Sequence, residues 1–598
     1  MKKLILTAVL FIISFSMLTA SNGQTVYTTR DEEYLRVEEL CRRAGVIGPS
    51  SFSPMPARAL LIAMERIDAS ALSEEDRNEY EELYAILTDD KYTFRDDYFE
   101  VDFNAAANLG VNLAPYNDFR YDNSDSKLPD YDKREDTLIP YRYEAPLFAL
   151  GLKMDFGEHI ALEARLDLKS NHLRMYESTL GGVFTFLPDT RQGLAAEIPF
   201  RAGGSFGNDY FNFIIGRFPH STGSGVTGNL IIGDNFNYQE VMLASLQSNH
   251  FTYNISITRF DQQDIAANNA SSKYYTDFSR HEFDGMQQFR INHCFDVTLF
   301  DKVRLALNLA TIYNSHYGFD FRFFYPFVLG HNYYNYANQT YLDEYDEANN
   351  IMSIEVEWAL TEGLTFSSQL AMDQLQTPIE DSTSLPSAFG LLVNLKYSTN
   401  TDNGTVSGWF ETVYTNPYLY LNGKYKNIGT DSDPIWVITQ QSFNLDYIVG
   451  YNMQYMDDFG YSGYIYGPDT IVFSLGCHYK DRADRFELGG DILYRVKGLK
   501  GLKHNTYRSN ETHIDMSGAV IEDNPDVFMN NIWAPSGGWK NAEHMIKIAV
   551  SGKYNFTPQP WGQVSLYSML GAFTYVNYNH EGDDRFVPQF TFGAKWVF

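Results

Sequence analysis

Cysteine, positive charge and long apolar runs are all scarce in this 598-residue sequence. The cysteines Cys41, Cys294 and Cys477 lie too far apart for a metal site or a disulfide framework, and we expect neither a metal nor a cofactor. The net charge of −30 argues against nucleic acid as a partner, and a solvated acidic surface explains it most simply. Beyond the N-terminus, no apolar run reaches the roughly 20 residues that a membrane-spanning helix requires.

The N-terminus carries the one long apolar stretch. Two lysines precede a nearly continuous apolar run over residues 4–18, and small residues follow at Ala20 and Gly23. This order is typical of a secretory signal, and the run is too short for a transmembrane anchor. We expect a signal peptide over residues 1–23 and export of the rest.

Aromatic residues are abundant. They make up 16% of the chain, with 43 Tyr and 43 Phe, yet the mean hydropathy of −0.32 is that of a water-soluble protein. A transmembrane β-barrel combines the two properties, because polar lumen and loop residues dilute the lipid-facing half of each strand.

Apolar and polar residues alternate through much of residues 98–598, which places them on opposite faces of strands. The clearest segments are 162–168, 251–258, 303–309, 354–360, 471–479 and 546–550. Charged residues on the second face indicate a polar lumen rather than a packed sandwich core. Short and long connections alternate as well, so we predict an all-β transmembrane barrel of about 16 to 20 antiparallel strands.

The C-terminal segment 587–598 shows the barrel pattern most clearly. Phe590, Phe592, Trp596 and Phe598 share one face of the predicted strand. In a soluble protein this aromatic edge would favour aggregation, whereas in a barrel it faces lipid and pairs with the first strand. The segment resembles the strand by which bacterial outer-membrane barrels are recognised for insertion. We expect an outer-membrane location, with membrane lipid and the barrel assembly machinery as partners.

Residues 24–97 differ from the rest, and we expect a small α-helical unit followed by an acidic connector. Asp31 opens an amphipathic helical pattern that Gly45 ends, residues 57–67 form a second candidate helix, and Ser73 opens a third. This unit would lie in the periplasm, either as a simple spacer or as a plug or docking element.

Two glycine motifs match enzyme signatures. Residues 203–207 fit the nucleophile elbow of hydrolases with Ser205 as the nucleophile, but the strand-like residues 211–215 that follow favour a glycine-rich hairpin. Residues 223–228 fit a dinucleotide-binding motif, but residues 230–232 predict a strand where that motif needs a helix. We expect no catalysis.

Several strand and turn segments resemble one known family. Gly216-Arg217 precedes Ser224-Gly225 and an apolar segment at 229–232; later, Asn349-Asn350 opens a hairpin that ends at Asp373. With the N-terminal helices, this order resembles the Wzi family of outer-membrane capsule-assembly proteins. The resemblance implies a barrel of about 18 antiparallel strands with a periplasmic helical bundle. It also implies a lectin-like role in holding capsular or other surface polysaccharide.

Candidate site residues fall into two groups. Arg217, Glu355 and Asp373 are candidates for a charge network in the lumen, where they could equally satisfy one another structurally. Aromatic residues in a predicted loop could stack on sugar rings or lie in the aromatic girdle at the membrane interface. These aromatic residues are Tyr333, Tyr334, Tyr336, Tyr341 and Tyr345.

The sequence leaves three functions open. The first is a polysaccharide-binding or anchoring barrel. The second is a porin or substrate-specific channel, which the same composition would support. The third is a barrel-embedded hydrolase that uses Ser205.

Overall fold

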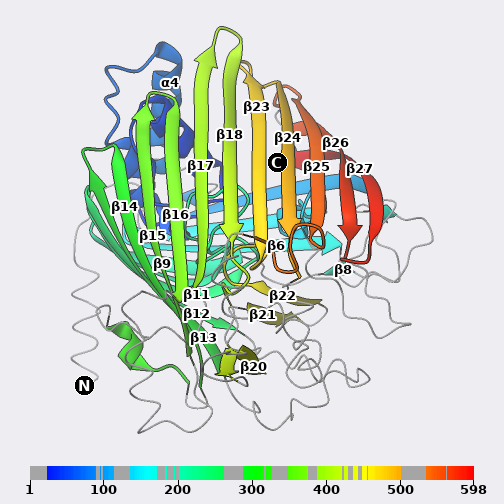
Figure 1. Ribbon diagram of the computed structural model, residues 1–598. Coiled ribbons are helices and arrows are strands. Elements are labelled where there is room, and N and C mark those ends of the chain that lie inside the picture. The colour runs from blue at the N-terminus through cyan, green and yellow to red at the C-terminus, as the bar shows by residue number, and fades with distance from the viewer. Residues whose placement is uncertain are drawn as a thin grey trace.

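The computed structural model describes most of the barrel and the helical unit. The described residues are 23–88, 94–95, 99–113, 135–170, 182–184, 194–195, 201–260, 287–315, 318–325, 348–374, 387–420, 423–427, 436–441, 448–453, 456–499, 534–559 and 562–597. Within them, 18 long antiparallel strands form one closed barrel, as predicted (Figure 1).

The long strands follow one another around the barrel in chain order. They are β4 (Glu100–Leu113), β5 (Phe148–Phe156), β6 (Ile160–Ser170), β9 (Arg201–Gly207), β10 (Phe211–Phe218), β11 (Gln239–Gln247), β12 (Phe251–Phe260), β13 (Gln287–Leu299), β14 (Val303–Ser315), β15 (Ala348–Thr361), β16 (Leu364–Gln374), β17 (Ala388–Thr401), β18 (Gly404–Thr415), β23 (Thr470–Asp481), β24 (Phe486–Lys497), β25 (Glu543–Asn555), β26 (Gln563–Tyr578) and β27 (Asp583–Val597).

Shorter strands complete the β-structure. β3 (Phe94–Arg95), β7 (Gly182–Phe184) and β8 (Leu194–Ala195) pair with barrel strands. Three separate two-stranded sheets are β1 (Val26–Tyr27) with β2 (Met55–Pro56), β19 (Gly423–Asn427) with β20 (Trp436–Gln441), and β21 (Ile448–Met453) with β22 (Met456–Tyr461).

The C-terminal strand closes the barrel. β27 pairs with β4 in a continuous register from Phe590 opposite Leu113 to Val597 opposite Ala106. Phe590 and Phe592 are 40% and 48% exposed on the outer face, whereas the preceding Gln589 and the intervening Thr591 are buried toward the lumen. Exposed and buried side chains thus alternate along this part of β27, and Phe598 lies outside the described residues.

The two ends of the barrel differ in their connections. One end, here called the short-turn end, carries the turns at 157–159, 208–210, 248–250, 300–302, 362–363, 402–403 and 482–485. The opposite end, the long-connection end, carries the connections that include 219–238, 316–347, 416–469 and 498–542. The predicted alternation of short and long connections is confirmed.

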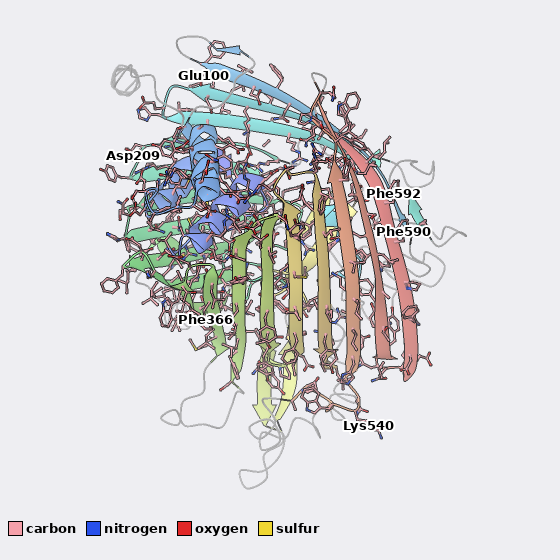
Figure 2. All side chains as sticks on the ribbon, turned by 90° about the horizontal axis from the view of Figure 1, so that it is seen from above. Glu100, Asp209, Phe366, Lys540, Phe590 and Phe592 are labelled. Atoms are coloured by element: carbon pink, nitrogen blue, oxygen red, sulfur yellow. The ribbon has the colours of Figure 1, made fainter. Side chains whose placement is uncertain are left out.

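Three helices precede the barrel and lie within the ring of strands when it is seen from above (Figure 2). They are α2 (Glu32–Arg43), α3 (Ala57–Met64) and α4 (Glu74–Thr88). Gly45, with a φ of 70°, follows the C-cap of α2, and the Ser73 hydroxyl accepts a hydrogen bond from Asp76 N at the start of α4. Among the described residues, no helix is long and apolar enough to cross a membrane.

Candidate functional site in the barrel lumen

The helical unit is fastened to the short-turn end through α2. Glu38 forms an ion pair with Lys396 on β17 at 2.9 Å and with Arg42 at 2.8 Å, and Gly363 N donates to Arg42 O. Burial alone would raise the pKa of Glu38, but the positive charges of Lys396 and Arg42 bring this pKa down to about 2. Glu38 is therefore ionised at neutral pH and holds α2 against the wall.

The extended segment after α2 reaches into the lumen. Arg304 on β14 donates to the carbonyl oxygens of Gly48 and Pro49 at 3.1 and 2.7 Å, and it is also ion-paired with Glu357. Further along, a ring nitrogen of His220 contacts Ser53 O. The segment after α2 thus contacts both the barrel wall, at Arg304, and the connection after β10, at His220.

The start of the helical unit is held by a partly buried arginine. Arg201 on β9 donates to both carboxylate oxygens of Asp31 at 2.7 and 3.0 Å and also pairs with Glu163 on β6. Burial opposes ionisation of Asp31, but the Arg201 charge outweighs it and lowers the Asp31 pKa. The N-terminal unit is therefore joined to the wall on several sides.

The connection between β10 and β11, residues 219–238, folds into the lumen and meets the helical unit there. Arg30 donates to both carboxylate oxygens of Asp234 at 2.6 to 2.9 Å and to Phe236 O at 2.6 Å. The Tyr143 hydroxyl, from the connection between β4 and β5, donates to Asp234 at 2.7 Å. Burial would raise the pKa of Asp234, but the Arg30 charge lowers it. Three segments far apart in sequence are joined at this carboxylate.

The glycine motif at 223–228 binds a carboxylate of the protein itself. Backbone N–H groups of Val226 and Thr227 donate to the two oxygens of Glu411 at 2.6 and 2.8 Å, and the Thr227 hydroxyl adds a third hydrogen bond. Glu411 is fully buried on β18, and Asn394 beside it donates to Ser224 O at 2.8 Å. Successive N–H groups of a turn form an anion-binding nest, and here Glu411 fills it.

The prediction of a strand at residues 230–232 is wrong. Leu230, Ile231 and Ile232 are fully buried in the lumen core and lie outside the named strands. Leu230 O accepts a hydrogen bond from the Tyr420 hydroxyl, and Leu230 N donates to Gln369 at 2.5 Å. A short apolar run fits a strand and a buried loop equally well, and here side chains of the wall satisfy its backbone.

Packing of these segments against the wall leaves little space. A cavity of about 30 Å³ lies between the N-terminal segment and the wall near Phe52 and Asn254, and another of about 20 Å³ lies near Cys294 and Glu355. Volumes of this size hold about one or two water molecules. These segments occupy part of the lumen, and we call residues 23–88 together with 219–238 the plug.

Arg217 does not lie where we expected. It shares the strand parity of Ile215, which is 54% exposed, so its side chain is on the outer face of β10. It forms an ion pair with Glu240 on β11 at 2.9 Å, and its guanidinium lies 4.8 Å from the Tyr238 ring. The luminal position predicted for Arg217 is wrong, because the following Phe218, not Arg217, turns inward.

Glu355 and Asp373 are held separately. Glu355 faces the lumen from β15 and accepts hydrogen bonds from Asn308 and Gln369, each at 2.6 Å. Asp373, at the irregular end of β16, accepts a hydrogen bond from Asn349. The two carboxylates are thus each bound by amide side chains, and a functional role for them stays a prediction.

The remaining candidates have different outcomes. Ser205 lies inside β9 and donates to Gln24 O, and β9 and β10 form the predicted glycine-rich hairpin. The candidate sugar-contacting tyrosines at 333, 334, 336, 341 and 345 lie outside the described residues.

The sequence did not predict the roles of Arg30, Asp234 and Glu411. Their partners are up to 204 residues away in the sequence, and no local pattern indicates these contacts.

Fold and lumen together define an outer-membrane β-barrel with an internal plug. The chain is similar in structure to Wzi from Escherichia coli over 95% of this chain and 98% of that one. Wzi is an outer-membrane protein involved in group 1 capsule assembly and is a carbohydrate-binding β-barrel. The TM-score is 0.54 at 11% sequence identity, and the structural resemblance to Wzi predicted from the sequence is confirmed.

Two outer-membrane proteins match less well. The channel DcaP of Acinetobacter baumannii has a TM-score of 0.32 at 11% identity and covers 85% of this chain and 100% of its own. OccK5 of Pseudomonas aeruginosa has a TM-score of 0.35 at 7% identity and covers 83% of this chain and 98% of its own. No family model and no curated protein matches the chain.

Proposed function

We propose that this chain is a plugged, non-conducting outer-membrane barrel that binds surface polysaccharide and helps to hold it at the cell surface. The observation that carries the proposal is the position of the plug inside the lumen, where it is hydrogen-bonded to Glu411 and Arg304 of the wall. A barrel closed in this way acts at its surfaces rather than as a conduit. The fold similarity to a carbohydrate-binding barrel supports polysaccharide as the ligand.

The proposal includes an orientation. Outer-membrane barrels have short periplasmic turns and longer external connections. The short-turn end and the helical unit therefore face the periplasm, and the long connections face the outside, where polysaccharide would bind. The signal peptide over residues 1–23 directs export. Tyr333, Tyr334, Tyr336, Tyr341 and Tyr345 are the proposed stacking residues in one of these connections.

Two alternatives are less well supported. A channel would need the plug to move, yet Arg30 and Glu411 hold it with partly buried, charge-assisted hydrogen bonds. A hydrolase would need Ser205 beside a general base, but its hydroxyl is committed to Gln24 O within a strand. We therefore propose binding without catalysis.

The test measures polysaccharide retention by cells. Deletion of the gene should shift surface polysaccharide from the cells into the medium, and the full-length chain should restore retention. Replacement of the five proposed tyrosines by serine should abolish restoration, whereas replacement by phenylalanine keeps the flat rings and should preserve much of it. Unchanged retention in the deletion strain would overturn the proposal, and a loss of solute uptake instead would favour the channel.

A further inference from the structure

Tyrosine and histidine form a hydrogen-bonded pair on the outer face of β12 and β13. Nδ1 of His293 lies 2.8 Å from the Tyr253 hydroxyl, and the rings stack with centroids 6.1 Å apart and planes at 15°. The intervening Asn254 and Asn292 are buried on the opposite, luminal parity. The outer wall of a membrane barrel is normally apolar, so a histidine there needs an explanation.

The same pair recurs on β24 and β25. Nδ1 of His544 lies 2.8 Å from the Tyr494 hydroxyl, with ring centroids 6.1 Å apart and planes at 14°. The register is the same as well. His293 is opposite Ile255 and His544 is opposite Val496, so each histidine faces the residue two positions after its tyrosine. A repeated geometry on two separate parts of the wall indicates a common structural task.

In both pairs, the second ring nitrogen binds a carbonyl group of the adjacent connection. Nε2 of His293 contacts Phe323 O at 2.7 Å, and Nε2 of His544 contacts Trp539 O at 3.0 Å. A carbonyl oxygen can only accept, so Nε2 carries the hydrogen and Nδ1 accepts the tyrosine O–H. Each histidine thus fastens a backbone segment to the wall with both ring nitrogens in hydrogen bonds.

The first fastened segment is residues 318–325, which contain the 3-10 helix η3 (Phe321–Phe324) and fold back on the outside of the wall. Phe323 stacks on Tyr313 of β14 with centroids 4.5 Å apart, and the Asp320 N–H donates to the Tyr313 hydroxyl. Figure 1 shows this turn as a short green helix beside the strands, near the long-connection end. Phe321 is 75% exposed and faces away from the wall.

Exposed aromatic side chains occur on both fastened segments. Phe324 and Tyr325 are 37% and 66% exposed, and Trp539 on the second segment is 51% exposed. Figure 2 shows Lys540, the neighbour of Trp539, at the outer margin of the ring of strands. Around them the outer wall is apolar and open, with Leu246 and Ile546 at 51% and 42% exposure. The aromatic side chains thus continue a surface that in an outer-membrane barrel contacts lipid.

We propose that these two aromatic segments are membrane anchors, fastened by the Tyr–His pairs, and that their partner is the lipid of the surrounding bilayer. Aromatic rings are favoured at the membrane interface, where an apolar body and a polar edge both find partners. Arg322 and Asp320 within the first segment form an ion pair at 2.5 Å, so these charges are matched there. Chain segments outside the strands would thus set the depth and tilt of the barrel.

Spin-label accessibility tests the anchors in the full-length protein reconstituted in phosphatidylethanolamine–phosphatidylglycerol vesicles. A Cys477→Ser background removes the exposed native cysteine, since Cys41 and Cys294 are buried. Labels at Phe321→Cys and Trp539→Cys are then compared for collision with oxygen, which enriches in lipid, and with a water-soluble nickel chelate. Leu475→Cys on the wall and Tyr210→Cys at a short turn, both exposed positions, serve as the lipid and water references.

We expect both anchor labels to resemble the Leu475 label, with oxygen collision several-fold above the Tyr210 label. Nickel accessibility equal to that of the Tyr210 label would overturn the proposal. Line broadening that disappears when labelled protein is diluted with unlabelled protein would also overturn it, because the partner would then be a second copy. Heat-modifiable gel mobility confirms that each variant is folded, and the two sites test the proposal independently.

Discussion

The guanidinium of Arg30 lies across the carboxylate of Asp234 at 2.6 to 2.9 Å, although 204 residues separate the two in sequence. Arg30 belongs to the N-terminal unit at the short-turn end, and Asp234 belongs to a connection that enters from the long-connection end. Their contact therefore joins the two halves of the plug inside the lumen. Loss of this contact should therefore loosen the plug.

Arg30→Gln should loosen the plug. The substitution leaves the partly buried Asp234 carboxylate with only the Tyr143 hydroxyl as a direct partner among the described residues, and the lost charged hydrogen bonds cost about 2 kcal/mol. Liposome swelling with a small sugar should reveal permeability that the native protein lacks. Arg217→Gln is the matched control, because its ion pair lies on the outer face. Equal tightness of both variants would mean that the Arg30 contact does not hold the plug.

Glu411→Gln should lower stability. The amide retains one oxygen but presents an NH₂ group toward backbone donors, so at least one partly buried N–H, of Val226 or Thr227, loses its acceptor. We expect a loss of about 2 kcal/mol, measured by urea unfolding in detergent. Glu240→Gln breaks a partly exposed ion pair and should cost less than about 1 kcal/mol. A Glu411 variant as stable as the Glu240 variant would contradict the proposed nest.

Much of the fold could be predicted from the sequence because its signals are local. Alternating apolar and polar residues predict strands such as β27. Ser73 indicates the start of α4, and Gly45 indicates the end of α2. The plug could not be predicted from the sequence. The short apolar run at residues 230–232 is equally typical of a strand and of a buried loop, so its pattern does not distinguish the two. Glu411 looks like any lumen-facing carboxylate until the glycine turn is placed against it. The packing inside the lumen depends on contacts between residues far apart in the sequence, which local sequence patterns do not reveal.

Acid should release the helical unit. The folded-state pKa of Glu38 is about 2, below its ordinary value of 4.5, so its contribution to stability is complete above pH 4.5 and is lost as the pH falls toward 2. The shift corresponds to a few kcal/mol at most, of order 3. Limited proteolysis by pepsin should therefore cut residues 24–88 faster at pH 2.5 than at pH 4.5, relative to cleavage of an unfolded reference substrate.

Glu38→Gln is the control for this pH effect. The variant has no titrating carboxyl at this position, so its cleavage should be faster than native at pH 4.5 and should change less between the two pH values. An unaltered pH dependence in Glu38→Gln would assign the acid release to other carboxylates, such as Asp31 with Arg201.

Removal of a single hydroxyl should loosen each anchor segment separately. Tyr253→Phe leaves Nδ1 of His293 without its donor, at a cost of about 1 kcal/mol, which corresponds to about fivefold faster local opening. Hydrogen exchange should quicken in residues 318–325 and not in 534–542. Tyr494→Phe should do the reverse, so each variant controls for the other. Equal effects on both segments would show that the pairs do not act locally.

Single-channel recording in a planar bilayer is the decisive test of a closed barrel. The full-length native protein should insert and remain silent, because the plug is hydrogen-bonded to the wall and the two cavities described between them measure about 30 and 20 Å³. Deletion of residues 24–88 should produce openings if the truncated barrel inserts. Large, steady openings of the native protein would contradict a plugged barrel and would make a channel the better description of this protein.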